Sequence, residues 1–209
     1  MRLTYFNGRG LAETTRCMFK LADASFVDDR IEIDFKTPGD FSTMTRPDFD
    51  ARRHQCEFEC SMNRLPLLAD GGALIAQSKA IERYVARKLG YMGDTEAESA
   101  QIDAICEHIR DFKDAYKQAK REGALDAWRP SFTQQTELLN KIVPAFLEKR
   151  TTPTLAHVAL YNFYHGFFDD DEMARQALEN CPKLRSMCNM IKYNPRMVIW
   201  EQERPKTAF

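Results

Sequence analysis

The sequence predicts a small mixed α/β domain followed by an all-helical domain. Two observations predict this arrangement. Strand-like and helical segments alternate before Gly90 in the order βαβ and then ββα, and the periodic segments after Gly90 have helical spacing. A polar segment at 91–98 connects the two halves. We therefore place one domain at residues 1–90 and a second at residues 91–209.

The first domain is predicted to begin with a strand, a helix and a second strand. Residues 3–6 form a short apolar-rich run, and residues 12–21 place Met18 and Leu21 on one helical face. Residues 25–33 alternate between polar and apolar side chains in the manner of a half-buried strand.

A hairpin and a helix complete the first domain. The turn residues Asp70-Gly71-Gly72 lie between apolar runs at 65–68 and 73–75, which indicates a β-hairpin. A helix is then expected from Ser78, whose hydroxyl suits an N-cap, to Gly90. Its apolar residues recur at helical spacing: Ile81, Tyr84, Val85 and Leu89.

The second half is predicted to consist of helices. Two long helices each carry one apolar face, and three shorter helices follow them. The first face comprises Ile102, Ile105, Ile109, Phe112 and Tyr116; the second comprises Leu138, Leu139, Ile142, Phe146 and Leu147; the shorter helices span 155–167, 172–180 and 183–193.

Composition and charge exclude several classes of function. The 209 residues are 44% hydrophobic, which suffices for a sizeable core. Thirty Lys and Arg against 31 Asp and Glu give a net charge of -1, so we expect neither nucleic acid nor an anionic membrane as a partner. No apolar run approaches the roughly 20 residues of a membrane span, and residues 1–6 lack the pattern of a secretory leader. We expect a cytoplasmic protein.

The cysteines point to reduced thiols. Six of them are scattered without the spacing of a disulfide framework, which suits the cytosol. His54, Cys56 and Cys60 lie close together in the sequence, but a fourth ligand at usable spacing for zinc is missing. We therefore expect no bound metal.

A tyrosine stands where a strand gives way to a helix. Tyr5-Phe6 ends the first strand, and a turn containing Gly8 and Gly10 precedes the helix. A turn of this kind presents free backbone N–H groups and the positive end of a helix dipole, and a Tyr hydroxyl beside it can donate to a thiolate. The alternative is a Tyr that packs with its hydroxyl in water.

Two further patterns suit a peptide ligand. Pro66 interrupts a strand-like run, and an edge, a bulge or a cis bond there leaves the backbone of Leu65 able to pair with a peptide. Gln77 and Ser78 begin the helix after the hairpin, where side-chain and free N–H donors can bind a carboxylate. The alternatives are that Pro66 only begins the next strand and that Ser78 only caps its helix.

In this order and spacing, the three patterns resemble the glutathione transferase family. The resemblance is closest to its sigma-like members, which include worm and mollusc transferases, S-crystallins and haematopoietic prostaglandin D synthase. It is nearly continuous over 3–10 and 65–90, and it extends through the C-terminal segment from Cys181 to Phe209. It implies a thioredoxin-like first domain, an all-helical second domain, a homodimer, and detoxification by conjugation of glutathione to small hydrophobic electrophiles.

The resemblance also implies a role for each site residue. Tyr5 would be the catalytic residue that hydrogen-bonds the glutathione sulfur. Pro66 would be a cis-proline that lets Leu65 pair with the cysteinyl backbone. The remaining contacts implied are Gln77 and Ser78 with the γ-glutamyl carboxylate, Arg64 near the glycyl end, and Asp111 of the partner subunit with the γ-glutamyl amine.

Three features depart from the family pattern, and two of them lie in the first domain. Many sigma-like members have an Arg before the Ala-Glu pair that helps to depress the Tyr pKa, and here that position is Leu11. Residues 33–62 form a longer segment than usual, in which Phe35 and Phe41 are only candidates for the aromatic contact with glutathione. We expect most of this insertion to be a mobile surface loop.

A third departure concerns a helix cap. The family has a Ser/Thr-x-x-Asp capping box at the start of a buried helix, whereas this chain has Thr154 followed by His157. Either Thr154 alone caps the helix or the local geometry differs.

Three functions remain open. The first is conjugation of glutathione to small apolar electrophiles. The second is a non-catalytic or weakly active structural protein of the same fold, comparable to S-crystallins. The third is a glutathione-dependent prostaglandin isomerase, which Gln118 disfavours because that enzyme would place a Trp there.

Overall fold

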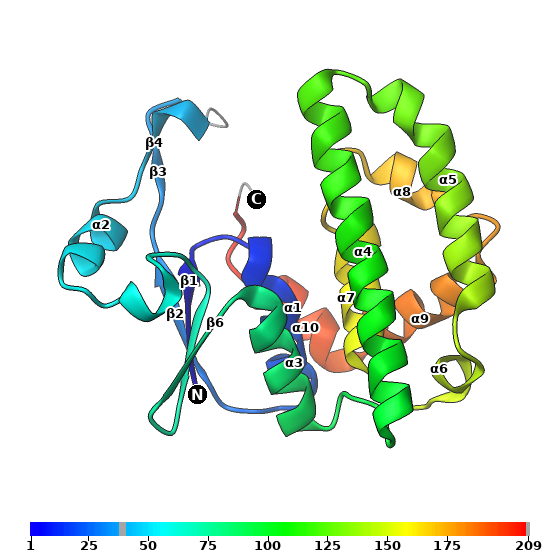
Figure 1. The fold of residues 1–209 in the computed structure, drawn as a ribbon, viewed down its shortest axis with the longest axis horizontal. Coiled ribbons are helices and arrows are strands. Elements are labelled where there is room, and N and C mark those ends of the chain that lie inside the picture. Colours follow the sequence, from blue (N-terminus) through cyan, green and yellow to red (C-terminus); the bar gives the residue numbers. More distant parts are fainter. Residues whose placement is uncertain (38–40, 208–209) are drawn as a thin grey trace. The chain divides into compact units, whose positions relative to one another are not determined.

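The computed structural model describes residues 1–37 and 41–207, and of Phe41 and Asp171 it describes the backbone only. The side chain of Phe41 and residue Phe209, both singled out in the sequence, therefore lie outside the described residues. The chain folds into two compact units (Figure 1): Met1–Leu89 together with Ile199–Phe209, and Gly90–Val198.

A four-stranded mixed sheet organises the first unit. β1 (Arg2–Phe6) lies between β2 (Val27–Ile31), to which it is parallel, and β5 (Leu67–Asp70), to which it is antiparallel. β6 (Ala73–Ala76) pairs with β5 through the predicted hairpin and completes the order β2-β1-β5-β6. This is the thioredoxin-like βαβ-ββα arrangement, so the predicted fold class is confirmed.

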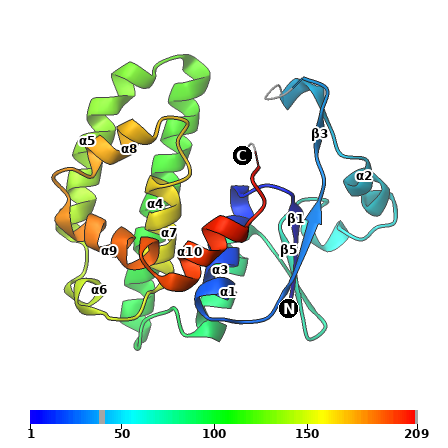
Figure 2. The ribbon, with the colours of Figure 1, turned by 180° about the vertical axis from the view of Figure 1, so that it is seen from behind.

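Two helices cover one face of this sheet. A short 3-10 helix, η1 (Gly10–Ala12), leads into α1 (Glu13–Leu21), and α3 (Ser78–Leu89) follows β6. Figures 1 and 2 show α1 and α3 side by side. The residues at the centre of their apolar faces and on the inward face of β1 are fully buried, which explains the helical periodicity of the sequence; they include Leu3, Met18, Phe19, Ile81 and Val85.

In its described residues, the insertion between β2 and β5 is not only the surface loop that the sequence predicted but contains regular structure. It contains a short hairpin, a helix and two 3-10 turns, and it adds Phe49 and Phe58 to a buried cluster with Ile31 and Leu67. The two rings stack with their centroids 5.3 Å apart. Burial of this aromatic surface stabilises the part of the insertion that carries Phe49 and Phe58. Its elements are β3 (Asp34–Phe35), η2 (Phe41–Thr43), β4 (Met44–Thr45), α2 (Pro47–His54) and η3 (Glu59–Ser61).

The second unit is helical, as predicted. The helix α7 (Leu155–Tyr164) is almost entirely buried, and α4 (Glu96–Glu122), α8 (Asp171–Ala177) and α9 (Pro182–Lys192) pack against it. None of the helices in the described residues is long and apolar enough to cross a membrane. The elements are α4 (Glu96–Glu122), α5 (Leu125–Ile142), α6 (Ala145–Lys149), α7 (Leu155–Tyr164), α8 (Asp171–Ala177) and α9 (Pro182–Lys192), with α10 (Pro195–Glu203) leading into the C-terminal segment of the first unit.

The predicted apolar face of α4 is confirmed, whereas that of α5 is confirmed at Leu139 and wrong at Leu138 and Ile142. Leu138 and Ile142 are 56% and 49% exposed, and α5 ends at Ile142, shortly before Pro144. The buried face of α5 consists of Leu139 together with Phe132 and Thr136, which the sequence analysis did not include. Thr136 belongs there because the hydroxyl of Tyr164 donates to its Oγ1 at 3.1 Å.

The cap of α7 uses histidine in place of a carboxylate. The backbone N–H of Thr154 donates to Nδ1 of His157 at 3.2 Å, and both residues are fully buried. A capping box therefore survives with an imidazole acceptor. Nδ1 accepts this bond only when it is unprotonated, and burial, assisted by Arg150, lowers the pKa of His157 to about 4.

The buried aromatic pair of the insertion gives a test of its place in the core. We expect Phe58→Ala to lower the free energy of unfolding of the first unit by about 3 to 5 kcal/mol, the usual cost of emptying a buried Phe site. Urea titration in a Trp128→Phe background, where Trp200 alone reports, measures this value. The control Met62→Ala alters a side chain that is 77% exposed and should change it by less than about 0.5 kcal/mol. Equal values for both variants would contradict the burial.

The imidazole cap predicts a pH-dependent stability. The folded-state pKa of His157 lies below its unfolded value near 6.5, so the unfolded chain binds the additional proton and the free energy of unfolding falls as pH decreases from about 6.5 to 4. The total loss from this group is on the order of 3 kcal/mol. His157→Asn keeps an acceptor without titrating in this range. The difference between the two proteins should therefore grow on acidification, and parallel urea-derived profiles would exclude the effect.

Candidate functional site

Tyr5 lies near the end of β1, with its ring buried and 8% of its surface exposed. The backbone N–H of Leu11, in η1, donates to the Tyr5 hydroxyl oxygen at 3.2 Å. This bond uses the oxygen as an acceptor and leaves the hydroxyl proton able to donate to a ligand. The sequence analysis predicted that Tyr5 lies at the turn between strand and helix, and the structure confirms this position.

Gly10 allows the tyrosine to approach the turn this closely. Its φ is +39°, and a Cβ at this position would stand 2.6 Å from the Tyr5 hydroxyl oxygen. Both the backbone angle and the contact exclude a side chain. The ring of Tyr5 and the turn are therefore fitted to one another.

A buried arginine that the sequence analysis missed lies beneath the same turn. Arg16 of α1 is fully buried, and its guanidinium carbon lies 5.8 Å from the centroid of the Tyr5 ring. Its Nε donates to Oδ1 of Asp28 at 2.9 Å, and its terminal nitrogens donate to the carbonyls of Gly8 and Phe6. Arg16 thereby connects the turn, the strand and the tyrosine.

The pKa of Tyr5 follows from these surroundings. Burial raises it above 10 as the largest effect, while the Leu11 N–H and the positive charge of Arg16 act in the opposite direction. Burial prevails, so the hydroxyl keeps its proton at neutral pH. A hydroxyl in this state can donate a hydrogen bond to an anion, whereas it cannot act as a general base.

Glu13 supplies the negative charge that accompanies Arg16. It is buried at the start of α1, 3.7 Å from the Arg16 guanidinium. Its Oε1 also accepts hydrogen bonds from the indole N–H of Trp200 at 3.0 Å and from Arg204 at 2.9 Å. The C-terminal segment of the first unit is thus joined to the helix that carries Arg16. An i,i+3 spacing of Glu13 and Arg16 is the signal by which the sequence could have revealed this pair.

Strand register brings the predicted N-terminal site residues to one edge of the sheet. Thr4 pairs with Leu67, and Leu67 pairs with Ala76. The next residues on one side of this row are Tyr5, which follows Thr4, Pro66, which precedes Leu67, and Gln77, which follows Ala76. Tyr5, Pro66 and the start of α3 therefore share one edge.

The proline segment has the predicted conformation. The Leu65–Pro66 peptide bond is cis. Pro66 is buried, Leu65 is half-buried, and Arg64 is exposed beside them. Pro66 directly precedes β5 at the edge described above, and the backbone of Leu65 lies just before it.

Gln77 and Ser78 differ in one detail from the expectation. Gln77 has a φ of +71°, and its carbonyl accepts the first helical bond, from the N–H of Ile81, at 3.0 Å. Gln77 therefore occupies the N-cap position and Ser78 is the first helical residue, so the N-cap assignment to Ser78 was wrong by one position. The first N–H groups of α3 point toward the same edge, where a helix start favours an anion.

The remaining predicted residues lie elsewhere. Asp111 is exposed on α4 of the second unit, and its contribution to a partner subunit's site stays a prediction. The side chain of Leu11, at the position of the expected Arg, is largely exposed, so only its backbone N–H serves Tyr5. Within the described residues, no cluster of three or more His, Cys, Asp or Glu is arranged to hold a metal ion.

Comparison with known proteins identifies the class to which this fold and site belong. The family model "Glutathione S-transferase, N-terminal domain" matches residues 1–87. Glutathione S-transferase 3 of Caenorhabditis elegans is 36% identical over 224 residues, covering 100% of this chain and 98% of the relative. Hematopoietic prostaglandin D synthase of Gallus gallus is 29% identical, covering 99% and 98%. S-crystallin 3 of Enteroctopus dofleini is also 29% identical, covering 99% and 98%.

Comparison with solved structures leads to the same family. The crystal structure of the glutathione S-transferase from Ascaris lumbricoides superposes with a TM-score of 0.75 at 27% identity, covering 100% of this chain and 98% of that one. Fold and relatives together define a transferase with a thioredoxin-like domain and a helical domain. The chain belongs to the glutathione S-transferase family.

The contact between Gly10 and Tyr5 is testable by stability. Gly10→Ala places a methyl group against the Tyr5 hydroxyl and forces a side chain into a positive φ, whereas the control Gly71→Ala has a φ of +55° and open space around it. Both variants incur the backbone cost of about 1 kcal/mol, and only Gly10→Ala should lose a further 1 to 2 kcal/mol of unfolding free energy. Urea titration and the amide NMR shift of Leu11 measure the outcome. Equal losses with an unchanged Leu11 shift would show that the ring does not depend on Gly10.

Proposed function

We propose that this chain conjugates glutathione to small apolar electrophiles, with Tyr5 donating a hydrogen bond to the glutathione sulfur. The observation that carries the proposal is the state of the Tyr5 hydroxyl. Its oxygen already accepts from the Leu11 N–H, and its raised pKa keeps its proton in place. Such a group can stabilise a thiolate but cannot remove the thiol proton.

The reaction follows from this role. A free thiol has a pKa of about 8.5, and a donated hydrogen bond at the sulfur favours the thiolate and lowers that value. The thiol proton leaves to solvent. The thiolate then attacks the electrophilic carbon with its electron pair, forming a C–S bond as the leaving group departs with the electrons of the bond that breaks.

The edge of the sheet suits the peptide part of glutathione. The Leu65 backbone before Pro66 would pair with the cysteinyl residue. Gln77, Ser78 and the start of α3 would bind the γ-glutamyl carboxylate. The exposed Arg64 would bind near the glycyl end, and Asp111 of the partner subunit would meet the γ-glutamyl amine, which requires a homodimer. We also propose a cytoplasmic location, because all six cysteines are free thiols.

A Tyr5→Phe substitution tests the proposal directly. Calorimetry with glutathione should show binding by both proteins, while the ultraviolet absorbance of the bound thiolate should show a lowered thiol pKa only in the wild type. Loss of one donor should reduce kcat on the order of a hundredfold. Tyr193→Phe, which changes a tyrosine that is mostly exposed, is the matched control.

Each result has a different meaning. Binding without a lowered thiol pKa in the wild type would favour the structural, S-crystallin-like alternative, because the peptide site would exist without activation. Absence of binding would overturn the glutathione site and leave the family membership and the fold unchanged.

A further inference from the structure

The C-terminal segment of the first unit is anchored at the start of α1, and Figures 1 and 2 show it beside that helix. Oε1 of Glu13 accepts a hydrogen bond from the indole N–H of Trp200 at 3.0 Å and another from Nη1 of Arg204 at 2.9 Å. Two cations lie over the Trp200 ring: the Lys20 ammonium is 4.8 Å from its centroid and the Arg30 guanidinium 5.9 Å. The segment thus meets a single carboxylate with an arginine that its tryptophan helps to place.

The charges beneath the turn that follows β1 form one connected set. Glu13 also lies 3.7 Å from the Arg16 guanidinium, and Nε of Arg16 donates to Oδ1 of Asp28 at 2.9 Å. Nε of Arg30 donates to the other oxygen of Asp28 at 2.8 Å. Two carboxylates are therefore shared by three guanidinium groups, which leaves one positive charge in excess. Loss of Arg204 would remove this excess.

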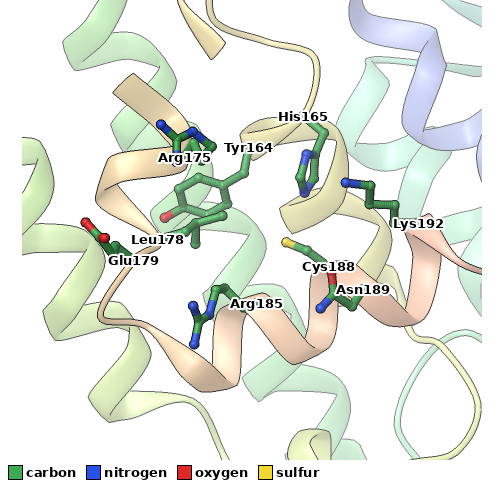
Figure 3. A pocket seen from close by; sticks show the side chains of 9 residues that line it. All are labelled: Tyr164, His165, Arg175, Leu178, Glu179, Arg185, Cys188, Asn189 and Lys192. Carbon is green, nitrogen blue, oxygen red and sulfur yellow. The ribbon is translucent and has the colours of Figure 1, made fainter. Parts of the chain in front are cut away.

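Burial determines how far such charges act. Figure 3 shows Arg175, Arg185 and Lys192 around a pocket of about 420 Å³ in the second unit, and all three residues are exposed, so water screens their charges. Arg16, in contrast, is fully buried, and Glu13 is 4% exposed. The charges of these two residues are screened much less and act on the groups around them.

Arg16 is the cation of this set that faces Tyr5, with its guanidinium carbon 5.8 Å from the centroid of the ring. Burial raises the pKa of Tyr5, and the positive charge of Arg16 lowers it. A more acidic hydroxyl is a stronger hydrogen-bond donor to an anion. The Glu13 carboxylate, so close to the same guanidinium, would cancel part of its charge if no second cation balanced Glu13. Arg204 is that second cation.

We propose that Arg204 is a positioning residue for the proposed reaction. By neutralising Glu13, it leaves the Arg16 charge to strengthen the hydrogen bond that Tyr5 donates to the glutathione sulfur. The inference rests on the proposed function for the identity of the anion, whereas the effect of Arg204 on Tyr5 itself requires no glutathione. It extends the site to a residue at the far end of the chain from Tyr5.

The titratable and charged groups around this set come from α1, β2 and the C-terminal segment. Cys17 lies with its sulfur 4.0 Å from Glu13, and Glu201 lies 3.9 Å from Arg204. A comparison of variants holds all of these groups constant except those substituted, so a difference in a pH profile reports the substituted charge. Among the described residues, the groups are Glu13, Arg16, Cys17, Lys20, Asp28, Arg30, Glu201 and Arg204.

The test measures two pKa values in the full chain. The first is that of the Tyr5 hydroxyl in the ligand-free protein, from the NMR shift of its labelled Cζ, with Tyr5→Phe for assignment. The second is that of the bound glutathione thiol, from its ultraviolet absorbance. Arg204→Gln should raise both, the thiol pKa by about 0.5 or more, so that kcat/KM falls about threefold or more at pH values below the thiol pKa and recovers at higher pH.

Two further variants serve as controls. Arg204→Lys keeps the positive charge and should retain most of the wild-type behaviour. Lys206→Gln makes the same change of net charge at an exposed position of the same segment and should leave both pKa values unchanged.

A double variant separates charge from structure. Glu13→Gln/Arg204→Gln removes both members of the ion pair, keeps an acceptor for the Trp200 indole and restores the excess positive charge. Both pKa values should therefore return toward those of the wild type. A purely structural role of Arg204 predicts the opposite, because two substitutions would disturb the segment more than one does.

The inference is overturned if Arg204→Gln leaves the Tyr5 pKa unchanged, or if the double variant fails to restore it. Neither result bears on the proposed function. The proposed function fails instead if the wild type does not lower the thiol pKa, and in that case the Tyr5 titration still decides the role of Arg204.

Discussion

The N-terminal site depends on the hydrogen bonds and ion pairs of the buried Arg16 guanidinium. A charge without access to water is tolerated only when partners surround it, and removal of one partner of such a charge typically costs 3 to about 5 kcal/mol. Asp28, Glu13 and two carbonyls of the turn provide those partners. The same set of bonds fixes the turn after β1, the start of α1 and the C-terminal segment through Trp200. The position of Tyr5 is therefore set by electrostatic constraints below the site as well as by contacts around its ring.

The surroundings of Tyr5 also determine the protonation state and the orientation of its hydroxyl. A tyrosine that had lost its proton would repel a thiolate, and a fully solvated one would bind water in its place. Burial keeps the proton on, and the Leu11 N–H orients the oxygen. The exposed Leu11 side chain shows that this second task requires a backbone group only. An arginine side chain at that position is one way to add positive charge near the tyrosine, and Arg16 supplies positive charge from the opposite, buried side.

The sequence predicted those parts of the fold whose periodicity reflects burial. The strands and helices of the first unit follow from alternation and helical spacing, and the edge that joins Tyr5, Pro66 and Gln77 follows from the hairpin. The insertion was mispredicted because Phe49 and Phe58 belong to a short helix and a turn, where no period is long enough to show. The face of α5 was mispredicted because its buried stripe includes Thr136, whose hydroxyl is satisfied by Tyr164. Arg16 was missed because an arginine in an amphipathic helix is ordinarily expected in solvent.

The cysteine thiols of the chain lie in surroundings that differ from those of a thiol beside Tyr5. An enzyme that presents electrophiles to a thiolate also exposes its own cysteines to them. Burial raises the pKa of the Cys181 and Cys188 thiols, and the neighbouring carboxylate of Glu59 raises that of Cys56 on the surface. Each of these shifts keeps a protein thiol protonated and therefore weakly nucleophilic. A hydrogen-bond donor such as Tyr5 acts in the opposite sense on a bound thiol. Under the proposed function, this difference would direct an electrophile to the glutathione sulfur and away from Cys56, Cys181 and Cys188.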